Sequence, residues 1–174
     1  MAPLASGVPM GASHGIGYVL GAAFDIPHGH TSCIMLPAVM RWNEKANYSR
    51  QVRVSQAMGS PETSASQLLE KLIQDLGMPT RLSDVDINAK DFASIAEKAM
   101  GTPWVPHNPR KINGPSDVLE ILKLAVQRML PGGVLGKKQL TKLKIYSGSD
   151  HPHSSQNPKI IELSKLNSKN IARN

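Results

Sequence analysis

Apolar residues recur at helical spacing along most of residues 4–130, and no clear segment shows the apolar–polar alternation of a half-buried strand. Glycine and proline interrupt the pattern where helices are expected to end. The spacing predicts about six helices, which cover residues 12–24, 27–43, 48–58, 61–76, 89–99 and 115–129. We therefore expect an all-α domain, a helical bundle over residues 4–130, followed by a basic, flexible tail over residues 131–174.

The first predicted helix is rich in glycine, with Gly15, Gly17 and Gly21. Each glycine weakens an isolated helix by roughly 1 kcal/mol relative to alanine. Such a helix needs a compensating reason, which is usually close packing or a ligand near the backbone. Gly15 and, beyond the next turn, Gly29 are expected to leave space for a metal or cofactor.

The second predicted helix is apolar on most faces, which indicates that it is buried. Asp25 is expected to cap its start, and Pro37 is expected to bend or interrupt it. Further along, Ser60 is expected to cap the helix that follows Gly59. Cys33 lies in the apolar helix, and we interpret it as a small buried hydrophobe rather than a nucleophile.

The chain carries a formal net charge of +7, and most of this charge lies in the tail. Residues 137–174 hold 8 lysines and arginines against 2 acidic residues, whereas residues 1–136 hold 12 against 11. A basic tail on a nearly neutral body is weak evidence for nucleic-acid binding, so we do not expect a nucleic acid as a partner. The single cysteine suits a reducing, cytoplasmic compartment, and no run of about 20 apolar residues predicts a membrane span.

Two histidines are the first candidates for a functional site. His14 lies in the first predicted helix and His28 at the start of the second. A turn at residues 25–27 could fold the second helix back, so that both imidazoles face one site. Neutral imidazole binds iron and zinc. A buried histidine is, however, more often a hydrogen-bonded structural residue, and a catalytic metal site normally has about three protein ligands.

Residues 11–43 read GASHGIGYVLGAAFDIPHGHTSCIMLPAVMRWN. They resemble the iron-containing (group III) alcohol dehydrogenases, which share His-Gly-x-x-His-x-x-Gly, then Pro-His-Gly, then Leu-Pro-x-Val-x-x-x-Asn. The wording is most similar to fungal maleylacetate reductase-like members. Later strings also fit, namely GMPTRLSDV, ASIAEKAM, PWVPHNPR and GPSDVLEILKLA. The resemblance covers about residues 4–126 and implies the helical C-terminal domain that this family shares with dehydroquinate synthase-like proteins.

The resemblance implies roles for three residues. His14 and His28 match the two family ligands that this half supplies to Fe²⁺ or Zn²⁺. Maleylacetate reductases are thought not to depend on a metal, in which case both histidines would contact substrate instead. Tyr18 stands where the family has a second histidine near the nicotinamide and substrate, so we expect it to take the catalytic place of that histidine. The expected substrate is a small alcohol, aldehyde or keto acid.

The same resemblance implies that much of the site lies elsewhere. The family's other two ligands, an aspartate and a histidine, and its NAD(P)-binding half belong to a region upstream of the segment that this chain resembles. No residue of this chain is therefore expected to bind NAD(P). We expect the chain to behave as a fragment with little or no dehydrogenase activity alone.

Other readings stay open. The chain could be a non-catalytic remnant or a partner-binding helical domain, because an uncovered apolar face tends to bind a second copy or another protein. His30 is expected to face solvent or substrate rather than a metal. The proline-rich loop around Trp104 and His107 is expected to be a packing strap, with a cofactor-facing role as the alternative. His151 and His153 are expected to lie on a surface segment.

Overall fold

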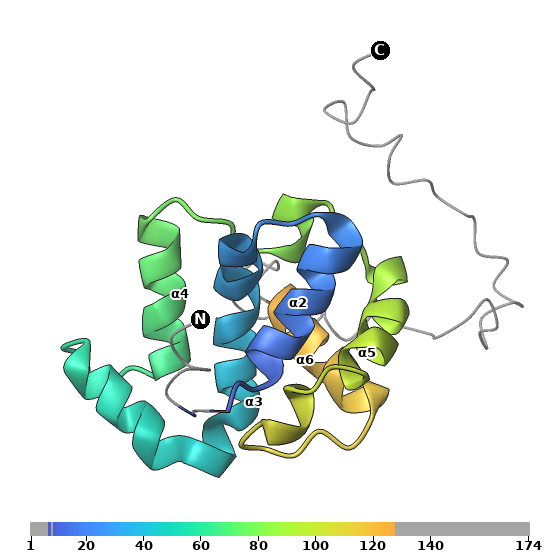
Figure 1. Cartoon of the computed structure of the whole chain (residues 1–174). Coiled ribbons are helices and arrows are strands. Elements are labelled where there is room, and N and C mark those ends of the chain that lie inside the picture. The colour runs from blue at the N-terminus through green and yellow to red at the C-terminus, as the bar shows by residue number, and fades with distance from the viewer. Residues whose placement is uncertain (1–6, 8, 128–174) are drawn as a thin grey trace, which may run out of the picture.

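The computed structural model describes residue 7 and residues 9–127, and in this part of the chain every regular element is a helix (Figure 1). The elements are α2 (Ala12–Phe24), α3 (His28–Ala57), α4 (Ala65–Asp75), η1 (Leu82–Val85), η2 (Ala89–Asp91), α5 (Phe92–Met100), η3 (Val105–His107) and α6 (Pro115–Gln127), where η marks a short 3₁₀ helix. The predicted all-α class is confirmed. The predicted tail lies outside the described residues, so its boundary stays a prediction.

Helix α3 is the element on which the bundle is built, since α2, α4 and α6 all pack against it. Helix α5 packs against α2 and α6 and closes the other side of the bundle, away from α4 (Figure 1). The buried core is aliphatic apart from Phe92 and Trp42. Its largest fully buried members are Phe92, Ile16, Leu20, Ile34, Met35, Leu82, Ile95, Ile121 and Leu122. Among the described residues, no helix is both long and apolar enough to cross a lipid bilayer.

Helix α3 joins two helices that were predicted as separate. The helix continues through Pro37, and its non-helical backbone angles lie at Asn47 instead (φ −137°). The bend predicted at Pro37 was therefore wrong in position. The Gln51 amide donates to the Met40 carbonyl at 2.8 Å and to the Asn47 Oδ1 at 2.8 Å, which bridges the kink. Beyond it, the second half of α3 turns away and runs beneath α4 (Figure 1).

Two predicted helix caps were wrong. Asp25 does not cap α3 but ends α2 in the left-handed conformation (φ 53°), and Pro27 precedes α3 with no side-chain cap. The connection is so short that Asp25 is used to reverse the chain. Ser60 does not start a helix either, because α4 begins at Ala65 after Ser64.

A buried asparagine pair ties the loop that follows α5 to the bundle. The Asn108 amide donates to Asn43 Oδ1 at 2.7 Å and to the Arg110 carbonyl at 2.7 Å. In return, the Asn43 amide donates to Asn108 Oδ1 at 3.2 Å, and the backbone N–H of Ala12 donates to the same oxygen at 3.3 Å. Asn108 therefore fixes this loop to the start of α2 and to the middle of α3.

Candidate metal and substrate site

The two predicted ligands come together at the junction of α2 and α3. The ring centroids of His14 and His28 lie 5.2 Å apart, with an angle of 70° between the ring planes. Close packing of the helices makes this possible, since a Cβ on Gly17 would lie 3.2 Å from the hydroxyl of Thr31. Glycine at that position lets α2 approach α3, which is one of the reasons expected for a glycine-rich helix.

The spacing of the two rings suits a shared ion. Because a Zn–N bond is about 2 Å long, two imidazoles on one tetrahedral ion place their ring centres about 5 Å apart. His14 is half-buried and His28 is exposed, so the pair is open on one side. Within residues 7 and 9–127, no group of three or more His, Cys, Asp and Glu side chains is placed to bind a metal. The donor type therefore fits iron or zinc, but the described residues supply only part of a coordination shell.

A third aromatic ring completes the cluster, and the sequence indicated it only as part of the proline-rich loop. The ring centroid of Trp104 lies 4.6 Å from that of His14 at 87°, and 5.2 Å from that of Tyr18 at 63°. Trp104 is half-buried and comes from the loop between α5 and η3. The interpretation of this loop as a packing strap was incomplete, because the loop also forms a wall of the candidate site.

Gly15 is the residue that admits this loop. A Cβ there would lie 2.7 Å from Thr102 Oγ1 and 2.7 Å from Val105 Cγ2. The expectation that Gly15 leaves space for a metal or cofactor was wrong, because the loop occupies that space. Gly29 differs, since no heavy atom of the described residues lies within 4 Å of the corresponding position. A tertiary contact, not a ligand, accounts for Gly15.

We expect Gly15→Ala to lower the free energy of unfolding by about 1–2 kcal/mol. Overpacking costs about 1–3 kcal/mol, and alanine's helix preference returns up to about 1 kcal/mol. Urea denaturation followed by circular dichroism measures the change. Gly29→Ala is the matched control, because its new methyl group enters open space and its stability should not fall. Equal stabilities of the two variants would contradict the account of the loop contact.

Tyr18 lies one helical turn after His14 on α2 and is 54% exposed. Its contact with Trp104 places its ring on the same surface as His14. The structure thus brings Tyr18 next to the histidine pair, and its catalytic role stays a prediction.

The environment of His14 favours its neutral form. Burial lowers the pKa of His14, and the nearby imidazole of His28 lowers it further. A neutral imidazole has a lone pair available for a metal. The role of His14 as a metal ligand stays a prediction.

The lowered pKa of His14 predicts that stability falls as the pH drops. The unfolded chain takes up this proton near the ordinary pKa of 6.5, whereas the folded chain takes it up only at lower pH. From about pH 7.5 to about pH 5.5 the unfolded state therefore binds more protons, and the free energy of unfolding decreases. Urea denaturation at the two pH values measures this decrease, which should be smaller in His14→Gln. His107→Gln, in an exposed loop position, should behave like the unsubstituted chain, and an equal decrease in all three would contradict the prediction.

The remaining candidates do not join the cluster. In the described part of the chain, ring contacts link His14, Tyr18, His28 and Trp104, and neither His30 nor His107 takes part. Cys33 is half-exposed rather than buried, so the interpretation of it as a buried hydrophobe was only partly right. The two tail histidines lie outside the described residues.

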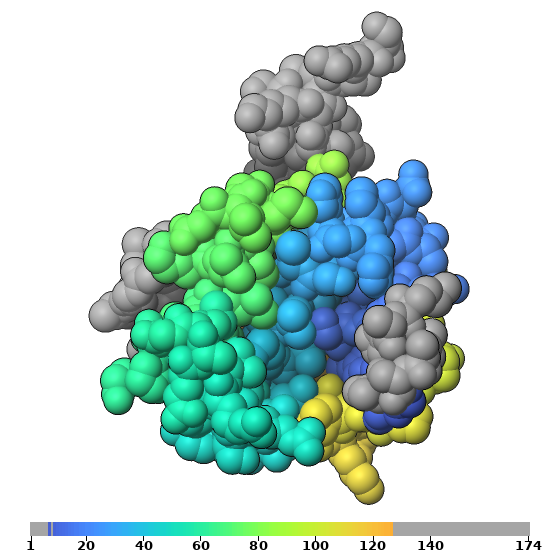
Figure 2. Space-filling model, turned by 60° about the vertical axis from the view of Figure 1, so that its left-hand side comes forward, coloured from blue at the N-terminus to red at the C-terminus, as the bar shows by residue number. Residues whose placement is uncertain are grey.

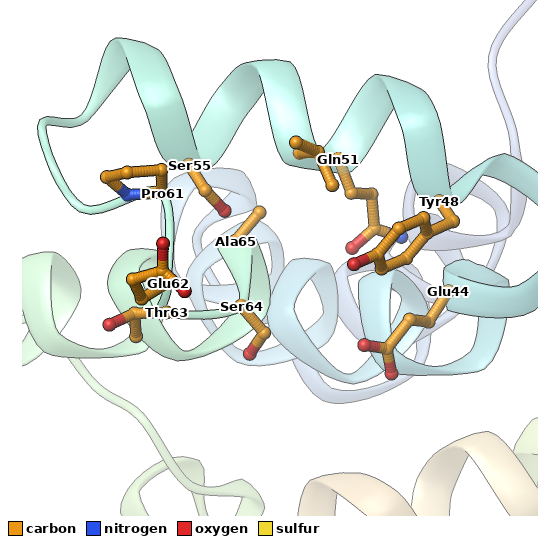
Figure 3. A pocket seen from close by; sticks show the side chains of 10 residues that line it. Glu44, Tyr48, Gln51, Ser55, Pro61, Glu62, Thr63, Ser64 and Ala65 are labelled. Carbon is orange, nitrogen blue, oxygen red and sulfur yellow. The ribbon is translucent and has the colours of Figure 1, made fainter.

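A separate cavity of about 170 Å³ lies between residues 44–55 of α3 and residues 61–65, which lead into α4 (Figure 3). Glu44 and Tyr48 line one end of it and Glu62 the other, so its two carboxylates do not form a pair. None of the predicted site residues lines this cavity. It is therefore not part of the candidate metal site.

Comparison with known proteins identifies the family. The pattern of the "Fe-containing alcohol dehydrogenase family, C-terminal" matches residues 4–126. The chain belongs to this family. The 1,3-propanediol dehydrogenase of Klebsiella pneumoniae is 32% identical over 113 residues, which are 60% of this chain and 29% of that enzyme.

Solved structures of the Fe-containing alcohol dehydrogenase family and its relatives share the fold. A 1,3-propanediol oxidoreductase superposes with a TM-score of 0.62 at 29% identity, over 66% of this chain and 32% of the other. The maleylacetate reductase of Agrobacterium tumefaciens gives a TM-score of 0.58 at 26% identity, over 67% of this chain and 31% of the other. The chain thus spans about a third of the length of these relatives.

A second similarity concerns a different class of protein. The large ribosomal subunit protein uL13 of Rhizobium meliloti (strain 1021) is 48% identical over 50 residues, which are 29% of this chain and 32% of that protein. Because the dehydrogenase family pattern already accounts for residues 4–126, we infer that this similarity falls mainly on the residues that follow.

Proposed function

We propose that residues 4–126 are the metal- and substrate-binding half of an NAD(P)-dependent oxidoreductase that interconverts a small alcohol with an aldehyde or keto acid. The convergence of His14 and His28, with ring centroids 5.2 Å apart, is the observation that carries this proposal. In the enzymes of this family, the half that binds NAD(P) lies outside the domain that residues 4–126 match. The proposed enzyme acts in the cytoplasm, which suits a chain with one cysteine.

His14 and His28 would hold Fe²⁺ or Zn²⁺, which when bound would polarise the substrate oxygen as a Lewis acid. Trp104 covers one side of His14 and keeps water from that side of the ring. The exposed phenol of Tyr18 donates a hydrogen bond to the substrate oxygen, as a hydroxyl can. The open side of the histidine pair would accept the remaining ligands and the cofactor half.

The test is an activity measurement on the chain and on a hybrid enzyme. The chain alone should not oxidise NADH or NADPH with an aldehyde or keto acid. A hybrid in which residues 4–126 replace the matching segment of the Klebsiella pneumoniae enzyme should do so, in a metal-dependent way. Turnover by the isolated chain, or a folded hybrid without any turnover, would contradict the proposal.

Tyr18→Phe should lower kcat/KM of the hybrid about tenfold, the effect of losing one hydrogen bond to a reacting oxygen. Steady-state kinetics with saturating cofactor measures it. Tyr48→Phe is the matched control, because Tyr48 is also exposed but lies by the separate cavity. If both substitutions left kcat/KM unchanged, Tyr18 would have no part in the reaction.

The alternative, a non-catalytic or partner-binding domain, rests on exposed apolar side chains. Val54 on α3, Met58 just after its end, Leu72 on α4 and Leu76 just after its end are exposed. Helix α4 and the second half of α3 form one side of the molecule (Figure 2). A second copy or another protein would cover them. Light scattering of the purified chain shows whether it is a monomer or an oligomer. A soluble, metal-free monomer whose segment also gives no activity in the hybrid would favour a non-catalytic remnant.

The uL13 similarity favours a second candidate function, RNA binding through the segment after residue 126. It argues against the sequence-based expectation that nucleic acid is not a partner. The 8 basic residues against 2 acidic ones in residues 137–174 supply the charge that phosphate contacts need. Filter binding to ribosomal RNA over a series of salt concentrations tests it. Loss of affinity on removing residues 127–174 would support RNA binding, and unchanged affinity would dispose of it.

A further inference from the structure

We propose that Trp104 is a positioning residue of the metal site, which holds the His14 imidazole in the orientation that lets His14 and His28 share one ion. This inference rests on the proposed metal-binding function and extends it to a residue outside the set of ligands. It concerns the orientation of a ring and not a bond to the metal.

The contact geometry of His14 supports this role. Its ring meets the Trp104 ring nearly at a right angle, 87°, with centroids 4.6 Å apart, and it meets the His28 ring at 70° and 5.2 Å. Such edge-to-face arrangements are the preferred geometry of aromatic pairs. A quarter-turn of the His14 ring about its bond to Cβ would change both interplanar angles and lose both edge-to-face arrangements. Trp104 and His28 together therefore restrict the plane of the His14 ring.

In residues 7 and 9–127, the usual means of orienting a ligand histidine is not found. A metal-bound imidazole normally donates its second N–H to a carboxylate or a carbonyl, which fixes the ring. Within the described part of the chain, neither His14 nor His28 makes a side-chain hydrogen bond. The ring of Trp104 is then the feature that restrains His14 from the loop side.

Trp104 can restrain another ring because its own loop is held. Val105 is fully buried, and the Thr102 hydroxyl donates to the Ala99 carbonyl at 2.7 Å. The backbone N–H of His107 donates to the Trp104 carbonyl at 3.1 Å. Asn108 adds its bonds to Asn43 on α3. The loop is therefore fixed on both sides of the tryptophan.

The test follows the histidine ring protons of the full chain by NMR while Zn²⁺ is added. Zn²⁺ should shift the His14 and His28 resonances together, and Trp104→Ala should weaken that binding about tenfold, as loss of a supporting group around a metal site does. Trp104→Phe keeps an aromatic edge and should stay within about threefold of the unsubstituted chain. Before zinc is added, Trp104→Ala should also move the His14 ring resonances, since a neighbouring ring current is lost.

Trp42→Phe is the matched control, because Trp42 is the chain's other tryptophan and packs against the Arg110 guanidinium instead. It should leave zinc affinity unchanged, and the amide spectrum shows whether each variant folds. If a folded Trp104→Ala variant kept the same zinc affinity and the same His14 resonances, the positioning role of Trp104 would be overturned. The proposed metal-binding function would not be affected by that result. If Zn²⁺ did not shift both histidines of the unsubstituted chain, the metal-binding function and this inference would fall together.

Discussion

Asn108→Ala is expected to lower the free energy of unfolding by about 3 kcal/mol, because it leaves several buried polar groups without partners. The lost acceptor serves the Ala12 N–H and the Asn43 amide, and the lost donor serves Asn43 and the Arg110 carbonyl. Asn108 is 5% exposed and Asn43 6%, so water does not readily replace these bonds. Urea denaturation followed by circular dichroism gives the value.

Asn113→Ala is the control for this measurement. Asn113 lies in the same connection between η3 and α6 but is exposed, so its side chain should contribute within about 0.5 kcal/mol. A stability loss for Asn108→Ala no greater than for Asn113→Ala would show that the asparagine pair does not hold the loop. The position of Trp104 would then lack its main anchor.

Replacing either histidine of the pair should lower kcat/KM of the hybrid enzyme by at least roughly 100-fold, since weaker perturbations around a metal site already cost 10- to 100-fold. His14→Ala removes a half-buried imidazole and His28→Ala an exposed one, so neither loss is expected to unfold the bundle. Steady-state kinetics and metal content of the purified variants measure the effect.

His30→Ala is the matched control for the pair. It lies two residues after His28 on the same helix, yet makes no ring contact with the cluster in the described part of the chain. Its kcat/KM should stay within about threefold of the parent hybrid. If His30→Ala and His28→Ala had equal effects, the pair of ligands would have been chosen wrongly.

The parts of the fold that depend on local pattern were predictable. Helix α2 has the bounds that the periodicity predicts, residues 12–24, and the two histidines lie together, as a short reversal between the two helices allows. The caps were less predictable. An aspartate such as Asp25 can cap the start of a helix or end a helix in the left-handed conformation, and the length of the connection decides which of the two occurs.

The parts that depend on distant contacts were not predictable. Gly15 is adjacent to His14 in the sequence. The space that a side chain at Gly15 would need is occupied by Thr102 and Val105, from a loop some ninety residues later. Trp104 enters the site through that contact, so no local pattern could place it there. The kink at Asn47 instead of Pro37 is different, since the bond that stabilises it is local: Gln51 donates to the Asn47 side chain one turn earlier in the same helix.

The central claim is that His14 and His28 bind one ion, and anomalous X-ray diffraction from crystals of the hybrid grown with Zn²⁺ tests it most directly. The account predicts a single strong peak about 2 Å from one nitrogen of each imidazole. Rings that face apart, or a zinc ion bound elsewhere with no density between the two, would contradict it.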